Sequence, residues 1–250
     1  MSSSGQEGFE GWSRLHGGIR PSAPVRAWHR LVQRLAAGPF ARVPPDVLSA
    51  AGVLSTMLAA LAAVAGGRWA LLTAALVLLA GLFDGLDGAV AVHTGRARPL
   101  GAVIDAMADR AGDLLLVATL AVLGAPPAWC VAVAGLVFGH EYLRARAQVA
   151  GLPGVGAVTV AERPTRIIVV AVTALGAAVL PGGTPGTGWS WAAVGAGGWL
   201  VVGVIGLVQL TIVVVRELPA QAGPTSSATI DADRATRGSP PPGCVDPPTR

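Results

Sequence analysis

Six long apolar segments constrain the fold of this chain more than any other feature. They lie at 47–65, 69–92, 101–123, 127–149, 163–181 and 189–215. At 1.5 Å per residue, a helix of each length crosses most or all of a hydrocarbon core about 30 Å thick. Only 13% of the residues are charged, whereas a soluble domain has about a quarter. The sequence therefore predicts an all-α, polytopic membrane protein with six transmembrane helices.

The arginines indicate how these segments are oriented. All 18 basic residues are arginine, and the net charge is +4. Twelve lie before the first segment, in the second connection or beside the fourth connection, whereas the alternate connections carry one arginine, Arg68. The positive-inside rule then places both termini in the cytoplasm. Arginines dispersed between apolar segments favour a membrane surface over nucleic acid as their partner.

The flanking segments differ in composition from the apolar region at 45–217. Residues 1–23 are rich in Ser and Gly and predict a disordered lead. Within 24–44, Arg26, Arg30 and Arg34 lie four apart among Trp, Leu and Val, which favours an amphipathic interfacial helix over a plain basic segment. Residues 218–250, rich in Pro, Ser, Thr and Asp, predict a disordered cytoplasmic tail.

Four carboxylates stand where apolar residues are expected. Asp84 and Asp87 end the second segment, and Asp105 and Asp109 begin the third. A carboxylate at the centre of a span costs about 2.5–3.5 kcal/mol on insertion scales. Acids three or four apart share a helix face, and the short connection at 92–100 makes the two helices antiparallel neighbours. We expect the acids to converge at the cytoplasmic end as an all-oxygen site for Mg²⁺ or Mn²⁺.

Small residues separate these acids. Three residues beside the carboxylates have at most a methyl side chain, namely Gly85, Gly88 and Ala91. A nucleotide or its phosphates can then approach the backbone closely. The alternative is that these are helix-packing residues beside interfacial acids, but two acidic pairs with interleaved glycines favour a functional site.

The acidic pattern resembles a known signature. It runs Asp84-x2-Asp87-Gly88-x2-Ala91-x9-Gly101-x3-Asp105-x3-Asp109 and is similar to that of the CDP-alcohol phosphatidyltransferase family. The resemblance extends from about Pro45 to Arg216, and residues 142–147 and 162–166 resemble segments of phosphatidylinositol phosphate synthases. It implies a six-span homodimer in a bacterial-type plasma membrane, with the site facing the cytoplasm. The implied reaction transfers a phosphatidyl group from CDP-diacylglycerol to a small alcohol such as glycerol 3-phosphate or inositol phosphate and releases CMP.

The resemblance also implies roles for individual residues. Asp84, Asp87 and Asp105 would hold Mg²⁺ or Mn²⁺, and Asp109 would deprotonate the acceptor while also serving as a metal ligand. Small residues would pack near the nucleotide, namely Gly85, Gly88, Ala91 and Gly101. Two further residues are candidates to hold a phosphate on the acceptor, with membrane anchoring as the alternative, namely Arg144 and Arg166.

Two positions depart from the family pattern. Val92 stands where the family usually has Arg, and Asp46 stands where Asn is usual. Val92 keeps open the alternative of a degenerate member that binds nucleotide or lipid without turnover. An ion carrier built on intramembrane carboxylates is a further alternative, although the acids gather at one end and are not repeated in the second half. A prenyltransferase is disfavoured because its paired acidic motifs lie on separate halves of a larger bundle.

Overall fold

The computed structural model describes residues 23–152 and 159–221, and within them the chain forms seven helices and no strand. The helices are α2 (Ala23–Ala37), α3 (Pro45–Ala65), α4 (Trp69–His93), α5 (Pro99–Val122), α6 (Pro127–Val149), α7 (Arg163–Val179) and α8 (Trp191–Gln221). Five of the six apolar segments are helical to within two residues of their predicted bounds, whereas α8 continues six residues beyond 215 to Gln221, through the start of the tail that was predicted to be disordered. The all-α prediction is thus confirmed, while nearly all of the predicted disordered lead and tail lies outside the described residues.

Local sequence signals mark the helix ends. Proline occupies one of the first two positions of five helices, at Pro24, Pro45, Pro99, Pro127 and Pro164. Proline suits the first turn because its missing N–H has no partner there. Gly66 follows α3 with φ 65° and Gly124 follows α5 with φ 99°, a left-handed backbone that glycine adopts without strain. Short connections of this kind make consecutive helices antiparallel.

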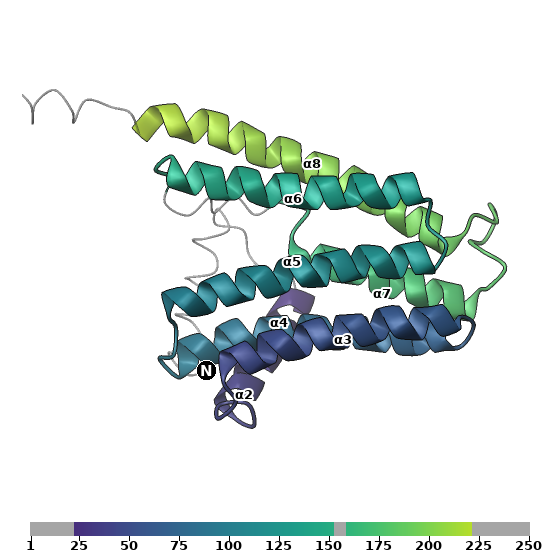
Figure 1. Ribbon diagram of the computed structural model, residues 1–250, viewed down its shortest axis with the longest axis horizontal. Coiled ribbons are helices and arrows are strands. Elements are labelled where there is room, and N and C mark those ends of the chain that lie inside the picture. The colour runs from purple at the N-terminus through teal and green to yellow at the C-terminus, as the bar shows by residue number, and fades with distance from the viewer. Residues whose placement is uncertain (1–22, 153–158, 222–250) are drawn as a thin grey trace, which may run out of the picture.

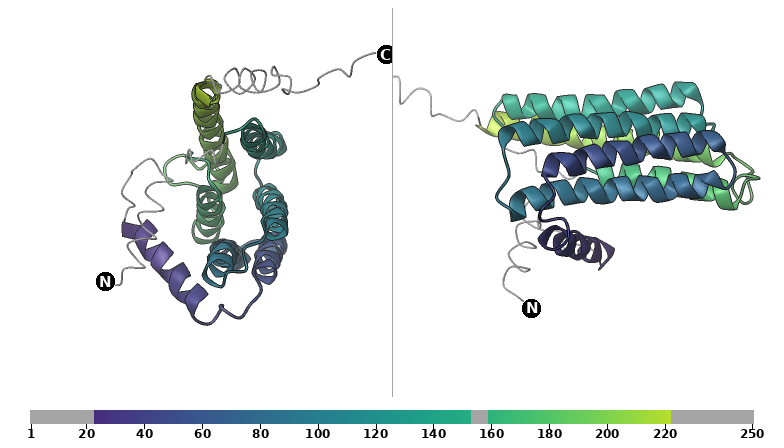
Figure 2. Two further views of the ribbon diagram at one scale, coloured as in Figure 1. Left: turned by 90° about the vertical axis from the view of Figure 1, so that its left-hand side faces the viewer. Right: turned by 60° about the horizontal axis from the view of Figure 1, so that its bottom comes forward.

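The six long helices form one bundle, and α2 crosses it at one end (Figures 1 and 2). Helix α3 packs against α4 and α5, α4 packs against α7, and α8 packs against α6 and α7. The largest buried cluster includes Val77, Leu120, Val133, Val170 and Trp199. This packing brings α7 beside α4 and α5, at the end of the bundle where α4 ends and α5 begins.

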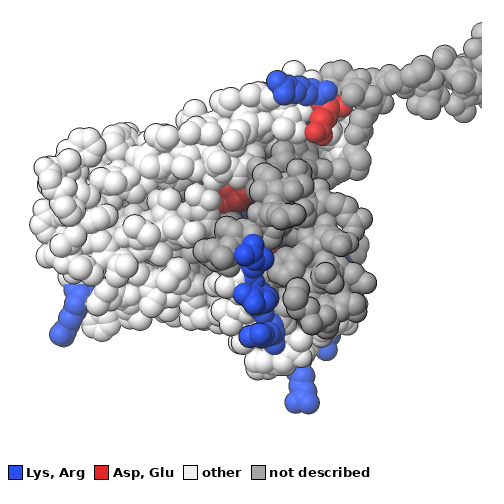
Figure 3. Space-filling view, turned by 180° about the vertical axis from the view of Figure 1, so that it is seen from behind, with Lys and Arg blue, Asp and Glu red and all other residues white. Residues whose placement is uncertain are grey.

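The outer surface of the bundle is apolar. Large side chains such as Val64, Val131 and Val179 lie exposed on it, and the flank seen in Figure 3 is uncharged over most of its length. Water does not favour so much exposed apolar area, whereas lipid does. These features fit a membrane protein, as predicted.

Length and composition divide the six long helices into two groups. Within the described ranges, three helices are long and apolar enough to cross a membrane: α3, α4 and the Trp191–Leu218 part of α8. Helix α7 has 17 residues, and α5 carries a group of charged residues, namely Asp105, Asp109, Arg110 and Asp113. The structure therefore gives three candidate spans where the sequence predicted six, and the count of six stays a prediction.

Helix α2 is amphipathic and is attached to the bundle. Val32 and Ala36 are buried and pack in a cluster with Leu48, Leu86 and Val90. Trp28 and Leu31 remain exposed. The segment predicted as an amphipathic helix is thus helical over Ala23–Ala37, and its apolar contacts hold it against α4, close to the acidic residues.

Candidate active site

Three of the four predicted acids meet in one cluster. Asp84 from α4 and Asp105 and Asp109 from α5 each offer a carboxylate oxygen, and these oxygens lie within 4.8 Å of one another. All three residues are partly buried. Helical spacing places Asp105 and Asp109 one turn apart. Helices α4 and α5 both pack against α3 and α7, and this shared packing brings Asp84 to the two acids of α5.

Asp87 faces a different surface of α4. Its carboxylate accepts a hydrogen bond from Ser49 Oγ at 2.6 Å and another from the Gly88 backbone N–H, also at 2.6 Å. The side chain is buried, and two short hydrogen bonds fix its position. Asp87 therefore lies beside the three-acid cluster in the wall of a neighbouring cavity.

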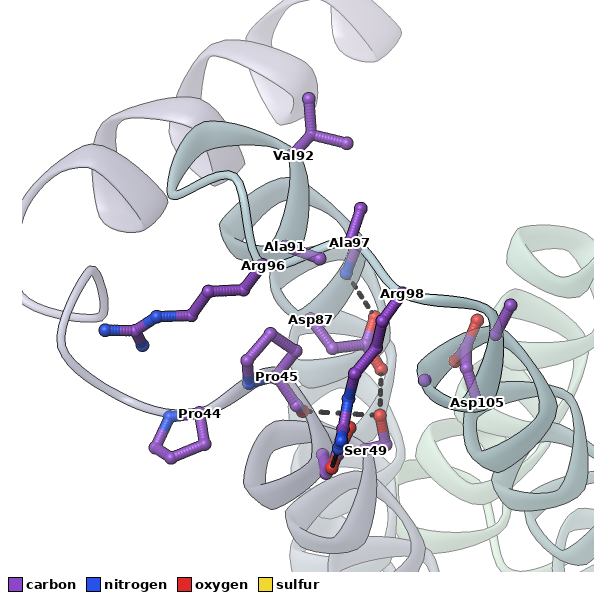
Figure 4. Close-up of a pocket in the computed structure, with 14 residues that line it drawn as sticks. Pro44, Pro45, Ser49, Asp87, Ala91, Val92, Arg96, Ala97, Arg98 and Asp105 are labelled. Atoms are coloured by element: carbon purple, nitrogen blue, oxygen red, sulfur yellow. Dashed lines mark hydrogen bonds and ion pairs between the residues drawn. The ribbon is translucent and has the colours of Figure 1, made fainter.

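This cavity has a volume of about 520 Å³ and opens between the ends of α3, α4 and α5 (Figure 4). Asp87 and Asp105 both line it, so Asp105 belongs to the cavity and to the acidic cluster. Among the predicted nucleotide-binding residues, Gly88, Ala91 and Gly101 line it as well. The cavity and the cluster thus form one continuous site.

The glycines differ in what they face. A Cβ at Gly88 would meet no atom within 4 Å, so this glycine opens onto free space. A Cβ at Gly101 would lie 3.2 Å from Arg98 Cγ, at the edge of the cavity. A Cβ at Gly85 would lie 3.4 Å from Val32 Cγ2. Gly85 therefore faces α2, and its smallness lets that helix pack closely.

The cavity also holds two arginines from the α4–α5 connection, Arg96 and Arg98. Arg98 forms an ion pair with Asp46 at the start of α3. Arg96 forms no ion pair or side-chain hydrogen bond with any residue in the described ranges. Val92, the position where the family usually has Arg, lies at the rim and is 78% exposed. A guanidinium is thus available in this cavity although position 92 does not supply one.

Arg163 is a site residue that the sequence reasoning missed. Its Nε lies 2.8 Å from Asp84 Oδ1, and its Nη1 donates a hydrogen bond to Asp109 Oδ1. The side chain is largely buried, and a Cβ at Gly112 would lie 2.9 Å from Nη2. Because Gly112 has no side chain, the guanidinium fits against α5. The only signal in the sequence was an arginine at the start of the fifth segment.

One turn further along α7, Arg166 lies in a separate buried network. Its Nε donates to the Ala161 carbonyl at 2.9 Å, Nη1 to Asp113 Oδ2 at 2.7 Å and Nη2 to Glu141 Oε1 at 3.4 Å. Arg110 pairs with the same two acids, at 3.1 Å and 3.4 Å. Arg166, predicted as a candidate for the acceptor phosphate, is therefore already paired on three sides.

The other predicted phosphate candidate, Arg144, pairs with Glu162 at 2.8 Å. Glu162 also accepts hydrogen bonds from the backbone N–H and the hydroxyl of Thr159. Burial raises the pKa of Glu162, but the Arg144 guanidinium and the Thr159 donors outweigh burial and hold this pKa below its ordinary value. Glu162 therefore stays ionised at neutral pH, and the Arg144 pair is a stable feature of the site.

The acidic cluster suits a divalent cation. Its three donors are carboxylate oxygens, the ligand type that Mg²⁺ and Mn²⁺ prefer. With all three carboxylates ionised, the single guanidinium of Arg163 leaves two negative charges uncompensated. One divalent cation balances that charge, so the residues fit a metal at this position.

Relatives and solved structures share this pattern. Phosphatidylinositol phosphate synthase of Mycolicibacterium smegmatis is 33% identical over 143 residues, which are 54% of this chain and 62% of that protein. The chain spans about half to two thirds of the length of the first curated relatives it matches. The crystal structure of Mycobacterium tuberculosis phosphatidylinositol phosphate synthase with CDP-DAG bound has a TM-score of 0.56 and 28% identity, over 74% of this chain and 94% of that one.

A second crystal structure of the M. tuberculosis enzyme, in complex with manganese and citrate, has a TM-score of 0.56 and 29% identity, over 73% of this chain and 88% of that one. The model of the CDP-alcohol phosphatidyltransferase family matches residues 42–215. This match covers most of the chain, from before α3 into α8, and includes the whole acidic cluster and its cavity. The chain belongs to the CDP-alcohol phosphatidyltransferase family, a family of transferases.

Proposed function

We propose that this protein transfers a phosphatidyl group from CDP-diacylglycerol to a small polyol phosphate and releases CMP. The carrying observation is that Asp105 belongs both to the three-acid cluster and to the cavity beside it. A metal in the cluster would thus adjoin a ligand in the cavity. The CDP-DAG complex of the M. tuberculosis relative supports the donor, and its manganese complex supports the metal.

The reaction requires a proton acceptor beside the acceptor hydroxyl. The hydroxyl oxygen forms a bond to the lipid-linked phosphorus, the bond from that phosphorus to CMP breaks, and the electron pair leaves with CMP. We assign the hydroxyl proton to the carboxylate of Asp109, which lies one turn further along α5 than Asp105. This role requires Arg163 to release the Asp109 oxygen that it holds.

The proposed metal ligands are Asp84, Asp87, Asp105 and Asp109, with Mg²⁺ and Mn²⁺ both as candidates. Three of them already converge, and Asp87 adjoins Asp105 along the cavity wall. A bound divalent cation would neutralise charge on the pyrophosphate and improve the leaving group. Ser49 holds Asp87 in place through the 2.6 Å hydrogen bond.

The nucleotide end of the donor fits the cavity. Part of its wall consists of residues with no side chain beyond a methyl group, namely Gly88, Ala91 and Gly101. Phosphates can therefore approach the backbone there. Arg96 brings a guanidinium without an ion pair among the described residues to the same wall. We propose that it contacts the donor phosphates, in place of the arginine that Val92 lacks.

Inositol phosphate is the first acceptor to test because two of the matched relatives are named as phosphatidylinositol phosphate synthases. Glycerol 3-phosphate is the alternative. Arg144 and Arg166 remain candidates for its phosphate, and each would share its guanidinium between that phosphate and its present acid. Arg144 is the more exposed of the two, with 23% of its side chain accessible.

In the membrane, we propose that the six helices from α3 to α8 span the bilayer as the transferase domain, residues 45–217. Helix α2 would lie at the interface, because its exposed Trp28 and Leu31 can enter the lipid. Both termini and the site would face the cytoplasm of a plasma membrane, and the functional unit would be a homodimer. The arginine distribution and the family resemblance support this arrangement.

The deciding experiment is an assay of CMP release by the purified chain in detergent with CDP-diacylglycerol and Mn²⁺. We expect release with inositol phosphate or glycerol 3-phosphate, and none after chelation. If the protein binds CDP and Mn²⁺ but releases no CMP with either acceptor, a binding member without turnover replaces this proposal. Mn²⁺ transport into vesicles without CMP release would favour an ion carrier.

A further inference from the structure

The guanidinium of Arg163 lies where a cation is needed between Asp84 and Asp109. We propose that Arg163 is an exchangeable counter-cation of the acidic cluster. It neutralises these two carboxylates when no divalent cation is present and withdraws from them when one binds. This inference rests on the proposed function, because it concerns the same cluster. It means that the affinity of the cluster for metal depends on Arg163 as well as on the carboxylates.

Arg163 lies close to its two acids, but not every N–H group in these contacts has an aligned hydrogen-bond acceptor. Nη1 donates one aligned hydrogen bond, to Asp109 Oδ1. Nε lies 2.8 Å from Asp84 Oδ1, yet this buried nitrogen has no hydrogen-bond partner with suitable geometry among the described residues. Attraction between opposite charges therefore contributes more to the Asp84 contact than a directed bond does. Such a contact can be exchanged for another cation without the loss of an aligned hydrogen bond.

Arg163 also contacts two of the carboxylates that would bind the metal. It contacts Oδ1 of Asp84 and Oδ1 of Asp109, and the acidic cluster consists of these two residues with Asp105. A divalent cation among the three carboxylates would lie next to the positively charged guanidinium, and the two would repel each other. The positive charge of Arg163 should therefore weaken metal binding, and metal binding should displace its side chain.

Arg163 reaches the cluster from a helix other than the two that carry the acids. Arg163 is the first residue of α7, and its side chain reaches across to α4 and α5. The guanidinium lies against Gly112, where a Cβ would be 2.9 Å from Nη2. Withdrawal would free the Asp109 oxygen, so that binding of the metal and exposure of the proposed base would be coupled.

The test is the affinity for Mn²⁺ of the purified full-length chain in detergent, without substrate, measured from the electron paramagnetic resonance signal of free Mn²⁺. We expect Arg163→Gln to lower the Kd about tenfold, because a like charge beside the site is removed. Arg163→Lys retains the charge and should bind Mn²⁺ with nearly the wild-type Kd. Arg68→Gln removes the same charge at the other end of α4 and should leave the Kd unchanged.

Gly112→Ala provides a second variant that keeps Arg163. Its added methyl group would displace Nη2, so the Kd for Mn²⁺ should also fall, and this variant decides the question if Arg163→Gln does not fold. An unchanged or higher Kd in the folded variant overturns the inference and makes Arg163 a residue that orients the carboxylates. Absence of Mn²⁺ binding by the wild-type protein would instead contradict the proposed metal site.

Discussion

Arg163 and Arg166 lie three residues apart at the start of α7, and their surroundings differ. Arg166 is 3% exposed and donates three hydrogen bonds, to a backbone carbonyl and two acids. Arg163 is 13% exposed, has one aligned hydrogen bond, and contacts acids that are each 26% exposed. A fully paired, buried guanidinium is held in place, whereas a partly paired one beside a carboxylate cluster can be replaced. Arg166 thus stabilises the fold, whereas Arg163 takes part in the proposed chemistry.

The same contrast separates the acids. Asp113 is 1% exposed and lies between Arg110 and Arg166, so its charge is balanced within the protein. Among the described residues, Arg163 is the one cation that forms an ion pair with an acid of the three-acid cluster. The cluster is therefore expected to carry activity and the network around Asp113 to carry stability.

The largest expected effect concerns the residue shared by the cluster and the cavity. Asp105→Asn should lower the rate of CMP release about a thousandfold, because one ligand of the charge-neutralising metal is lost. The melting temperature should change little, because Asp105 has no ion pair among the described residues. Glu217→Gln, an exposed acid on α8, is the control and should keep its rate. A full rate in Asp105→Asn would remove the cluster from the mechanism.

The comparison of the two arginines is tested next through stability. Arg166→Gln would leave Asp113 without its closest partner in a buried position, and breaking a buried pair costs about 3–5 kcal/mol. Arg163→Gln should cost less, because its acids are partly exposed to solvent. The measurement is the melting temperature of each variant in detergent by scanning fluorimetry.

Adding Mn²⁺ should separate the melting temperatures of the two arginine variants further. It should raise the melting temperature of Arg163→Gln more than that of the wild-type protein, because ligand binding stabilises the folded state in proportion to affinity. Equal losses of stability in the two variants, with equal recovery on adding Mn²⁺, would mean that both arginines serve the same structural role.

A third prediction concerns Arg144, the more exposed of the two candidates for the acceptor phosphate. Arg144→Gln should raise the KM for the polyol phosphate about tenfold, since a charge-assisted contact to the phosphate is lost. The affinity for CDP should stay unchanged, because Arg144 is not among the residues that line the nucleotide cavity. A lower melting temperature without a change in KM would assign Arg144 to its pair with Glu162 alone.

The convergence of three of the four acids could be expected from the sequence because it depends on short-range features. Asp105 and Asp109 are one turn apart on α5, and the short connection between His93 and Pro99 keeps the end of α4 near the start of α5. Spacing alone did not separate Asp84 from Asp87. Residues three apart differ by about 60° around a helix, enough for one to enter the cluster while the other faces the cavity.

The basic half of the site could not be predicted in the same way. Arg163 meets Asp109 across 54 residues of sequence, and Arg166 meets Asp113 across 53. These contacts depend on the packing of α7 against α4 and α5, which no short-range pattern encodes. Gly112 had no recognisable role until the position of Arg163 was known. The positive-inside rule explained both arginines equally well, so it could not distinguish their roles.

The smallest expected effect extends the contrast between paired and unpaired arginines to the cavity. Arg98 is paired with Asp46 and half-exposed, and exposed pairs contribute about 0–1 kcal/mol. Arg96 has no such partner in the described part of the chain. Arg96→Gln should therefore weaken CDP binding about fivefold, and Arg98→Gln less than twofold. Isothermal titration calorimetry with CDP measures both, with cytidine as the ligand that lacks phosphate.

The ligand comparison makes this last prediction specific. If Arg96 contacts phosphate, its loss should leave the affinity for cytidine unchanged, and added salt should reduce the difference from the wild-type protein. A larger loss in Arg98→Gln would show that the Asp46–Arg98 pair shapes the cavity, because breaking the pair frees the start of α3 from α5. An equal loss for CDP and cytidine in Arg96→Gln would mean that Arg96 supports the cavity wall and does not contact the phosphates.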